Sequence, residues 1–537
     1  MERDRRVRIY NAHSWTGISL GLFLFVVCFT GSVALFHHEL QSWEDPARRV
    51  AMPESPIPVQ PLVDDWVAAY APENITFLGV HMPDFYEPYY MAFANVREAE
   101  GEPVEFRRIR WHAATGDVLP ERGDGLSTWL LDFHRDLMWP DALGGRQIGR
   151  GLVGIAGVIM LLSIITGILT HRKILKEFFT YRTKKTVRVK WKDAHNFLGI
   201  WSLPFSTMIA FTGAWLGIVV LLLPITAMLV FKGDTEKVVE VVAGAPAERA
   251  GISAPMISFD EMAQREHSTL GGKPVYISAT LIGDKNAEYV VNYKPESRLF
   301  YFESERVSAV TGELLPATGL NEPTAATRTL AAMSPLHYGT FGGAALKFLY
   351  LGLGLATSVM IALGNMVWIE RRANSAEGSQ SPQFYDRLSR LTAGVCAGVA
   401  VATVAIFYTD VFYHGDEDAR IFWIGVTYFG VWLAATLFAF IAANGYRATR
   451  TLTAVTGVSM LGVPVLSFLS AGEMPLAAFA RGHLAAPAAD ATIFVLGLIT
   501  LIVAYRLPTE RKAEKNRQRR RAKPAAAMLE ELGEEAA

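Results

Sequence analysis

The 537-residue sequence is poor in charge and in cysteine, and both shortages limit what it can be. Charged residues make up 19% of the chain, against about a quarter in a typical soluble protein, and 51% of residues are hydrophobic. The two cysteines, Cys28 and Cys396, lie in apolar runs, so we expect neither a disulfide framework nor a cysteine-based metal site. A net charge of −1 argues against a generally basic chain that binds nucleic acid. These shortages leave a membrane protein as the expected class.

Apolar runs long enough to cross a hydrocarbon core of about 30 Å, which takes roughly 20 helical residues, are plentiful. We expect eight spans, at about 15–36, 148–170, 197–230, 343–369, 391–412, 420–443, 452–470 and 489–506. The third run is long, and Pro204 and Pro224 are expected to kink it or to mark where it leaves the bilayer. We do not expect the first run to be a cleaved signal peptide, because it is too long and has no Ala-x-Ala exit.

The positions of Lys and Arg predict the orientation. Basic residues gather at the start of the chain and in alternate connections, namely 3–8, 172–192, 371–390, 447–450 and 506–523. The connection at 413–418, on the other side, is acidic. Because retained Lys and Arg mark the cytoplasmic side, we expect both termini in the cytoplasm of a bacterial inner-membrane protein.

Two segments on the outer side, about 39–147 and 232–341, are too long for simple loops. Residues 104–111, 288–293 and 299–303 have the alternation or composition of strands, so each segment should be a small α+β domain. The expected fold is a mainly α, polytopic membrane protein with a duplicated four-helix core. Its expected parts are 1–38 (N-terminus and first span), 39–147 (first outer domain), 148–231 (second span, basic loop and third span), 232–341 (second outer domain), 342–372 (fourth span), 373–506 (four further spans) and 507–537 (charged tail).

An internal repeat underlies the expected core. Residues 11–18 match 193–200 at an offset of 182, and 29–31 match 211–213 at the same offset. Further on, 115–120 match 311–316, His134 has a counterpart in His337, and Gly167 has one in Gly364. Two such units of helix, outer domain and helix are parallel repeats about an axis along the membrane normal. The last four spans do not share the pattern and look like a C-terminal addition.

Several histidines lie at the ends of spans, where ionisable groups are rare and tend to be functional. His13, His171 and His195 are at cytoplasmic ends, and His37, His38, His134 and His337 are at outer ends or just before the helices. The repeat axis places His13 opposite His195, and His134 opposite His337. Two facing imidazoles can supply both axial ligands of a haem, so two haem sites are expected. For any single histidine, an interfacial anchor is an equally good reading.

Glycines strengthen the case for the inner group. Gly17, Gly199 and Gly167 each lie four residues from a histidine (His13, His195 and His171) and one turn deeper, on the same helix face. Such a glycine leaves room for a large flat group, although close helix packing would also use it. His171 and His38 lack histidine counterparts, and either could replace a symmetric partner, so the pairing stays open. Zinc is a weaker alternative, because no compact His-Glu-x-x-His or cysteine-bearing site is present.

As an ordered set, residues 11–17, 29–31, 167–174, 178–179, 195–204, 336–339 and 341–343 resemble the PepSY-associated transmembrane proteins, also described as iron-regulated or iron-uptake membrane proteins. The resemblance covers roughly 8–372. It implies an inner-membrane ferric-siderophore reductase with two b-type haems, PepSY-like outer domains, and haem ligands among His13, His171, His195, His134 and His337. His38 is a weaker candidate. The last four spans lie outside the resemblance.

The sequence therefore predicts a transmembrane electron carrier that receives electrons from a quinol or a cytosolic reductase and reduces a ferric siderophore or other iron chelate outside. Trp111, Trp139 and Tyr338 are candidates to face the chelate, although an interfacial belt or a domain core would also explain each one. One alternative is a permease or siderophore-release factor without redox activity. Another is a membrane-anchored regulator whose outer domains bind a partner. The sequence names no catalytic residue.

Overall fold

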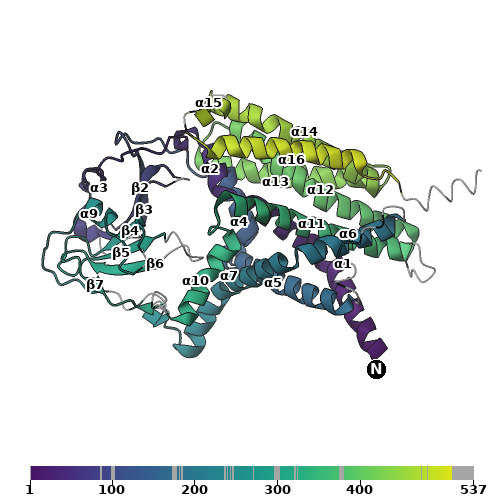
Figure 1. Ribbon diagram of the computed structural model, residues 1–537, viewed down its shortest axis with the longest axis horizontal. Coiled ribbons are helices and arrows are strands. Elements are labelled where there is room, and N and C mark those ends of the chain that lie inside the picture. The colour runs from purple at the N-terminus through teal and green to yellow at the C-terminus, as the bar shows by residue number, and fades with distance from the viewer. Residues whose placement is uncertain are drawn as a thin grey trace, which may run out of the picture.

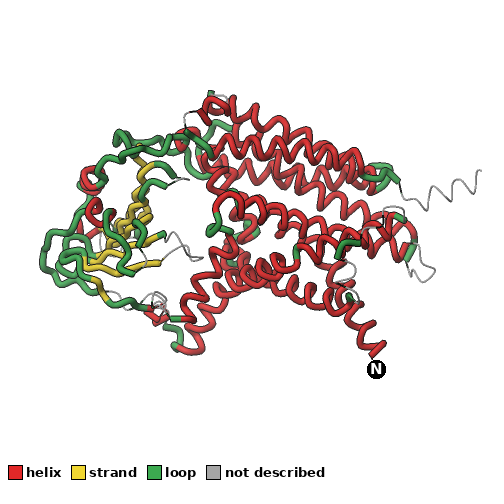
Figure 2. The backbone as a smooth tube through the Cα atoms, in the orientation of Figure 1, coloured by secondary structure: helices red, strands yellow, loops and turns green. Residues whose placement is uncertain are grey.

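The computed structural model describes residues 2–510 except for 85–86, 98–102, 172–173, 175–177, 181, 183–185, 235–236, 239, 242–243, 245–246, 270, 295–302, 320–321, 323, 374–379, 473–474 and 481. Long helices form most of the molecule, and the strands gather at one end of it (Figures 1 and 2). Most of the predicted strand at 299–303, parts of the basic connection at 172–192 and the tail from 511 onward lie outside the described residues.

Eight helices of the described chain are long and apolar enough to cross a membrane, which confirms the predicted number of spans. They are α1 (Glu2–Ala34), α5 (Gly145–Thr170), α7 (Leu203–Val230), α11 (Gly343–Ala373), α12 (Pro382–Phe412), α13 (Glu417–Ile441), α14 (Gly445–Ala471) and α16 (Ala485–Arg506). The long third run is two helices, because α6 (Val187–Trp201) ends before Ser202. Pro204 lies in the first turn of α7, where its missing N–H costs no helical hydrogen bond, and Pro224 lies inside α7.

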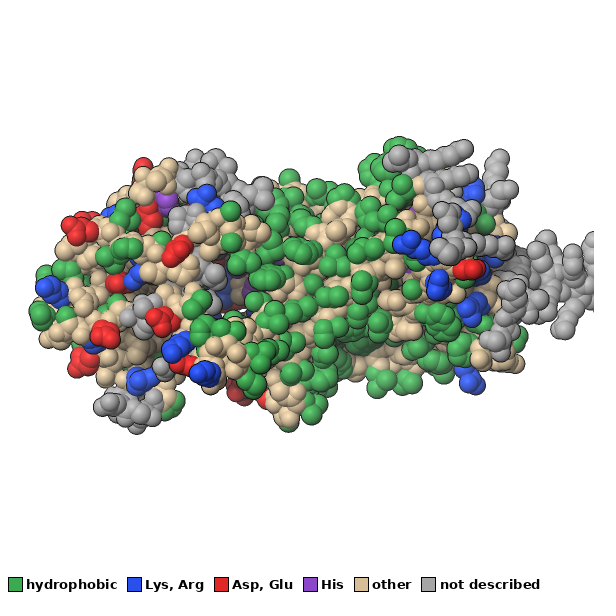
Figure 3. All heavy atoms as spheres, turned by 90° about the horizontal axis from the view of Figure 1, so that it is seen from below, with side chains coloured by type: hydrophobic (Ala, Val, Ile, Leu, Met, Phe, Trp, Pro, Cys, Tyr) green, Lys and Arg blue, Asp and Glu red, His purple; other side chains and the backbone are tan. Residues whose placement is uncertain are grey.

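On the face shown in Figure 3, apolar side chains cover the helical part between the sheet and the basic residues at the far end. Leu162, Leu229, Leu433 and Ile502 are each more than half exposed there, as lipid-facing residues would be. On one side of this apolar surface lies the sheet, and we call this the sheet side. On the other side lie arginines at helix ends, among them Arg372 and Arg447, and we call it the basic side.

Seven antiparallel strands form one sheet in the order β3-β2-β1-β4-β5-β6-β7. They are β1 (Ile75–His81), β2 (Tyr89–Val96), β3 (Glu105–His112), β4 (Pro274–Thr280), β5 (Glu288–Tyr293), β6 (Glu303–Ser308) and β7 (Leu314–Leu315). The predicted strands at 104–111 and 288–293 correspond to β3 and β5. The two insertions were expected as separate small domains, yet β1 pairs with β4 and joins them into a single sheet.

Alternation within the strands explains which face is covered. Val80, Ala92, Ile277 and Val291 are fully buried on one face, which packs against α3 (Gln60–Val67) and α9 (Phe259–Ala263). Short elements connect the sheet and the spans: η1 (Pro46–Arg48), η2 (Pro72–Asn74), η3 (Asp141–Leu143), α2 (His37–Glu44), α4 (Leu126–Asp136), α10 (Ala325–Tyr338) and α15 (Pro475–Ala480). Of these, α4 and α10 are equivalent in the repeat, and each immediately precedes a span on the sheet side.

The spans divide into two groups. The repeat helices form a four-helix core, in which α1 packs on α11 and on α5, and α5 packs on α7. The added helices α12, α13, α14 and α16 pack mainly on one another, and they lie along one side of the core against α11, α2 and α4 (Figure 1). The core therefore carries the repeated histidines, and the extension supports one side of it.

Candidate functional site

Four of the predicted histidines meet in two pairs. His13 of α1 faces His195 of α6, with ring centroids 6.4 Å apart and planes at 65°. His134 of α4 faces His337 of α10, with centroids 6.3 Å apart and planes at 16°. Each pair joins equivalent positions of the two repeats. The structure thus brings together the histidines that the repeat relates by symmetry.

Each of the four rings is held by its Nδ1 atom. In the inner pair, Nδ1 of His13 lies 3.0 Å from the carbonyl oxygen of Ser163, and Nδ1 of His195 lies 2.8 Å from that of Met360. In the sheet-side pair, Nδ1 of His134 lies 3.0 Å from the carbonyl oxygen of Val27. Nδ1 of His337 lies 3.0 Å from the hydroxyl of Thr212, and the carbonyl of Ile209 also faces this ring. A carbonyl oxygen only accepts, so Nδ1 carries the hydrogen, and the Nε2 lone pair is left for a ligand bond. Ligating histidines in metal sites use their other nitrogen in this way.

Each ring also lies against a glycine of a neighbouring helix. A methyl group built at Gly31 would lie 2.6 Å from Cε1 of His134, and one at Gly213 would lie 2.9 Å from Cε1 of His337. The corresponding distances are 3.1 Å from Gly364 to His195 and 3.3 Å from Gly167 to His13. Since real Cβ atoms almost never come closer than 3.0 Å, the rings of His134 and His337 need glycine at Gly31 and Gly213. At Gly364 and Gly167 an added methyl group would be tight and would push the ring by a few tenths of an ångström.

The four ring sites share one sequence spacing. In each, the backbone carbonyl that faces Nδ1 lies four residues before the glycine, as in the pairs Ser163/Gly167, Met360/Gly364, Val27/Gly31 and Ile209/Gly213. Residues four apart share a helix face, so the acceptor and the space for the ring are one turn apart on one surface. The repeat had aligned these glycines without revealing that they contact the histidines.

The glycines predicted beside the inner histidines have different surroundings. Gly17 has open space where a side chain would lie, which agrees with room for a bulky group beside His13. A methyl group built at Gly199 would instead lie 3.0 Å from the sulfur of Met360, and one at Gly167 would lie against His13 of another helix. His171, which ends α5, lies within electrostatic range of His195 but belongs to neither pair. His38 lies beside His37 in α2, with centroids 5.4 Å apart and planes at 58°.

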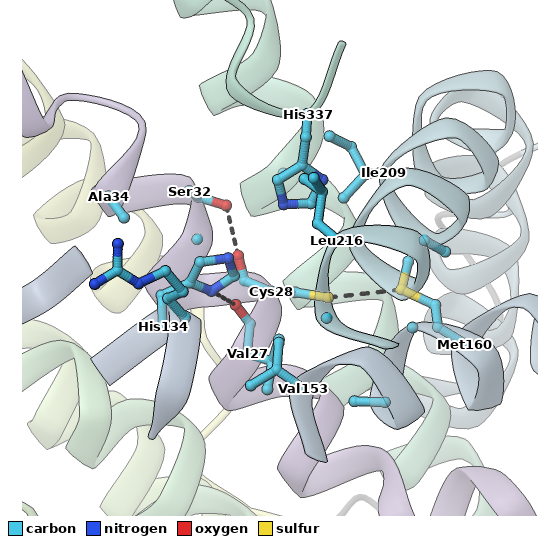
Figure 4. Close-up of a pocket in the computed structure, with 18 of the residues that line it drawn as sticks. Val27, Cys28, Ser32, Ala34, His134, Val153, Met160, Ile209, Leu216 and His337 are labelled. Carbon is cyan, nitrogen blue, oxygen red and sulfur yellow. Dashed lines mark hydrogen bonds between the residues drawn. The ribbon is translucent and has the colours of Figure 1, made fainter. Parts of the chain in front are cut away.

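A cavity of about 310 Å³ contains the pair on the sheet side. His134 and His337 reach into it from different helices, and Cys28 and Met160 lie further along its wall (Figure 4). Its walls come from α1, α4, α5, α7, α10 and α11 and are mostly apolar. Besides the two histidines, their polar side chains are Ser32, Arg135, Arg150, Ser206, Tyr338, Tyr350 and Thr357. Its volume lies in the range of cofactor and small-molecule sites, roughly 300–1,000 Å³.

Burial keeps the two sheet-side histidines neutral. Desolvation lowers the pKa of His134 to about 4, against the opposing effect of its bond to Val27. Desolvation and the neighbouring His134 lower the pKa of His337 to about 3. At neutral pH both rings are therefore uncharged, and their Nε2 atoms are in the state that binds a metal.

The spacing of the pairs fits one metal ion between two imidazoles. A metal–nitrogen bond of roughly 2 Å on each side, added to the two ring radii, puts the centroids roughly 6 Å apart. Among the described residues no three His, Cys, Asp or Glu side chains gather as metal ligands. A bare zinc site would need three or four protein ligands, whereas a haem brings four nitrogens of its own. The pairs therefore fit the axial ligation of haem.

The outer aromatic residues divide between core and cavity. Trp111 is buried in the sheet core against Trp66, and the indole of Trp139 donates to the carbonyl of Leu143 at 3.0 Å. Tyr338, next to His337, lines the cavity. An unforeseen aromatic cluster lies on the sheet face turned away from α3 and α9, and it consists of Phe77, His81, Phe93, Phe106 and Tyr276. Only their alternation along separate strands could have indicated it.

Comparison with known proteins agrees with this arrangement. A family model described as the PepSY-associated TM region matches residues 10–371. The chain is also 26% identical over 390 residues to Uncharacterized protein PA4219 of Pseudomonas aeruginosa, a match that covers 70% of this chain and 93% of that protein. The family match begins just before His13 and ends with α11, so it includes both histidine pairs and excludes the extension.

Proposed function

The chain belongs to the family of PepSY-associated transmembrane proteins, and we propose that its four-helix core is an electron carrier holding two b-type haems. One observation carries the proposal. Two histidine pairs with centroids 6.3 and 6.4 Å apart lie at opposite ends of the same core, and every ring is held by Nδ1. His13 with His195, and His134 with His337, would hold the two irons. The haems supply a one-electron iron couple.

The chain's own contribution is position and environment. The carbonyl acceptors of Ser163, Met360 and Val27 fix the ring orientations and increase electron donation from Nε2. Apolar walls around the sheet-side pair keep bulk water from the metal ligands. Two sites at different depths shorten each electron step through a core that is about 30 Å thick.

We further propose that the electrons reduce a ferric siderophore or similar chelate on the sheet side. One electron converts Fe(III) to Fe(II), which hard oxygen ligands bind less tightly, so reduction promotes release of the iron. The positive-inside rule puts the basic side in the cytoplasm and the sheet in the periplasm of a bacterial inner membrane. A quinol or a cytosolic reductase would then supply electrons near His13 and His195.

Absorption spectroscopy tests the haem proposal. The full chain, expressed with adequate haem and purified in detergent, should show reducible b-type Soret and α bands and about two haems per chain. His13→Ala or His195→Ala should remove one haem, and His134→Ala or His337→Ala the other. His414→Ala, in the exposed loop between α12 and α13, is the matched control and should keep both. A wild-type protein without these bands would refute the proposal.

A second experiment tests the reaction. In vesicles with the sheet side outward and a quinol in the bilayer, a chromogenic Fe(II) chelator outside should report reduction of an added ferric chelate. Loss of either histidine pair should abolish the signal. Uptake of the intact chelate that survives loss of both pairs would favour a permease instead.

A further inference from the structure

The sheet-side cavity has one charged end. Its lining near Leu24, Met160 and Ala210 is uncharged and mostly apolar, and the hydroxyls of Ser206 and Thr357 there bond each other, whereas Arg150 and Tyr338 lie at the opposite end. Arg150 is in the second turn of α5, and Met160 is about 15 Å deeper along that helix at roughly 1.5 Å per residue. The histidine pair lies between these two ends. His337 packs on Gly213 of α7, and Gly217, one turn further along that helix, packs against the backbone of Arg150.

None of the described residues forms an ion pair with Arg150. Asp136 lies within electrostatic range of Arg150, but its carboxylate is already paired with Arg146 (3.1 Å) and Arg135 (3.8 Å). The buried Nε of Arg150 also has no hydrogen-bond partner within the described residues. Arg150 is only partly buried near the sheet-side end of α5, so its guanidinium remains available to an anion that enters the cavity.

The counterpart of Arg150 in the second repeat has a carboxylate partner, which Arg150 lacks among the described residues. With the offset of 197 that relates Gly167 to Gly364, Arg150 corresponds to Lys347 of α11. Lys347 is 4% exposed, and its Nζ donates to both carboxylate oxygens of Glu39, at 2.8 and 3.0 Å. With the offset of 182, the counterpart of Glu39 is Leu221, which packs near Gly151. One repeat therefore supplies a carboxylate to its cation, and the other does not.

We infer that Arg150, with the hydroxyl of Tyr338 nearby, binds a propionate carboxylate of the haem between His134 and His337. Haem has two carboxylates on one edge and apolar substituents on the other, which matches a cavity with a cation at one end and mostly apolar walls at the other. The propionate edge would face the sheet side. This inference rests on the proposed haem function.

The test isolates the sheet-side haem by using a His13→Ala/His195→Ala background. There, Arg150→Gln should weaken haem retention by about tenfold or more, the size expected for one lost hydrogen bond to a charged group. It should also lower the midpoint potential, because the lost positive charge had favoured the reduced iron. Leu221→Glu recreates the pairing seen at Lys347 and should have the same effect without removing Arg150.

Arg146→Gln is the matched control, because this arginine is exposed and already paired. Its haem content and potential should resemble those of the parent. If the wild-type chain binds no haem, the proposed function itself fails. If the parent binds haem but neither Arg150→Gln nor Leu221→Glu changes its retention or potential, the inference alone is overturned. An effect of both variants on chelate affinity only would overturn it too, and would assign Arg150 to a carboxylate of the substrate.

Discussion

At the scale of single residues, glycine determines where the histidines can lie. The ring of His134 occupies space that any side chain at Gly31 would take, and the same holds for His337 and Gly213. The precision of each pair therefore depends on the absence of a Cβ atom on the facing helix. Substituting the glycine that faces a histidine should therefore disturb that histidine pair alone.

Gly31→Ala should displace the ring of His134, because the added methyl group would lie 2.6 Å from Cε1 of that buried ring. Overpacking of this kind costs roughly 1–3 kcal/mol, enough to weaken haem binding about tenfold. Haem content should fall from about two towards one per chain, with the inner haem unchanged. Gly352→Ala, where an added methyl group meets no atom within 4 Å, should behave as wild type. Equal haem loss in both variants would contradict a specific role for Gly31.

The symmetric pairing predicts that His171 and His38 are dispensable as ligands. His171→Ala and His38→Ala should each keep two haems with unchanged band positions, because neither residue belongs to the His13/His195 pair or the His134/His337 pair. His195→Ala, by contrast, should lose the inner haem. Retention of both haems in His195→Ala together with loss in His171→Ala would show that His171, not His195, is the inner ligand.

At the scale of elements, helix α4 depends on its neighbours for its position. Its N-cap is Gly125, which offers no capping side chain, and a carboxyl oxygen of Glu44 in α2 instead accepts from the N–H of Ser127 at 3.0 Å. Arg420 of α13 donates to the carbonyl of Asp124 at 3.1 Å. Trp129 of α4 packs on Tyr428 of α13, with centroids 4.6 Å apart. The extension thus supports the helix that carries His134.

Glu44 makes this support pH-dependent. Burial, and secondarily the nearby charge of Asp410, raises its pKa from 4.5 to about 8, although the bonds from Ser127 and the charge of Arg420 oppose the rise. The folded state therefore keeps a proton that the unfolded state loses, and stability should fall as pH rises from about 4.5 to 8 and then level off. Glu44→Gln, which stays neutral, should flatten this dependence. Thermal unfolding of both proteins across this range checks it, and equal slopes would contradict the assignment.

At the scale of the whole molecule, the core and the extension should be separable in function. Removing 374–537 deletes the contacts of α13 with α4 but leaves both histidine pairs in the chain. We expect such a protein to keep the inner haem and to lose the sheet-side haem about tenfold more readily. Because a truncated membrane protein can misfold, Tyr428→Ala/Phe429→Ala in the full chain provides a second test through haem release rates. Equal retention at both sites would contradict the supporting role.

Much of this architecture follows from patterns that are local in the sequence. Apolar runs predict the eight spans, and the offset of 182 predicts the partnership of His13 and His195. The contacts of Gly31 and Gly364 with histidines could not be predicted, because they depend on how separate helices pack. The joining of β1 to β4 depends on pairing across almost 200 residues, and no local pattern specifies it. The sequence offset identifies Lys347 as the counterpart of Arg150, but only the packed structure shows that Lys347 has an ion pair and that Arg150 has none among the described residues.

The shared sheet also restricts how this molecule can move. β1 belongs to the first repeat and β4 to the second, and they are paired from Leu78 opposite Ala279 to His81 opposite Tyr276. Rotation of one half against the other, as in alternating access, would shear this pairing along its length. The shared sheet links the two repeats through backbone hydrogen bonds on that side of the membrane. A motion of this kind would therefore have to break the hydrogen bonds between β1 and β4 or carry both strands along as one body.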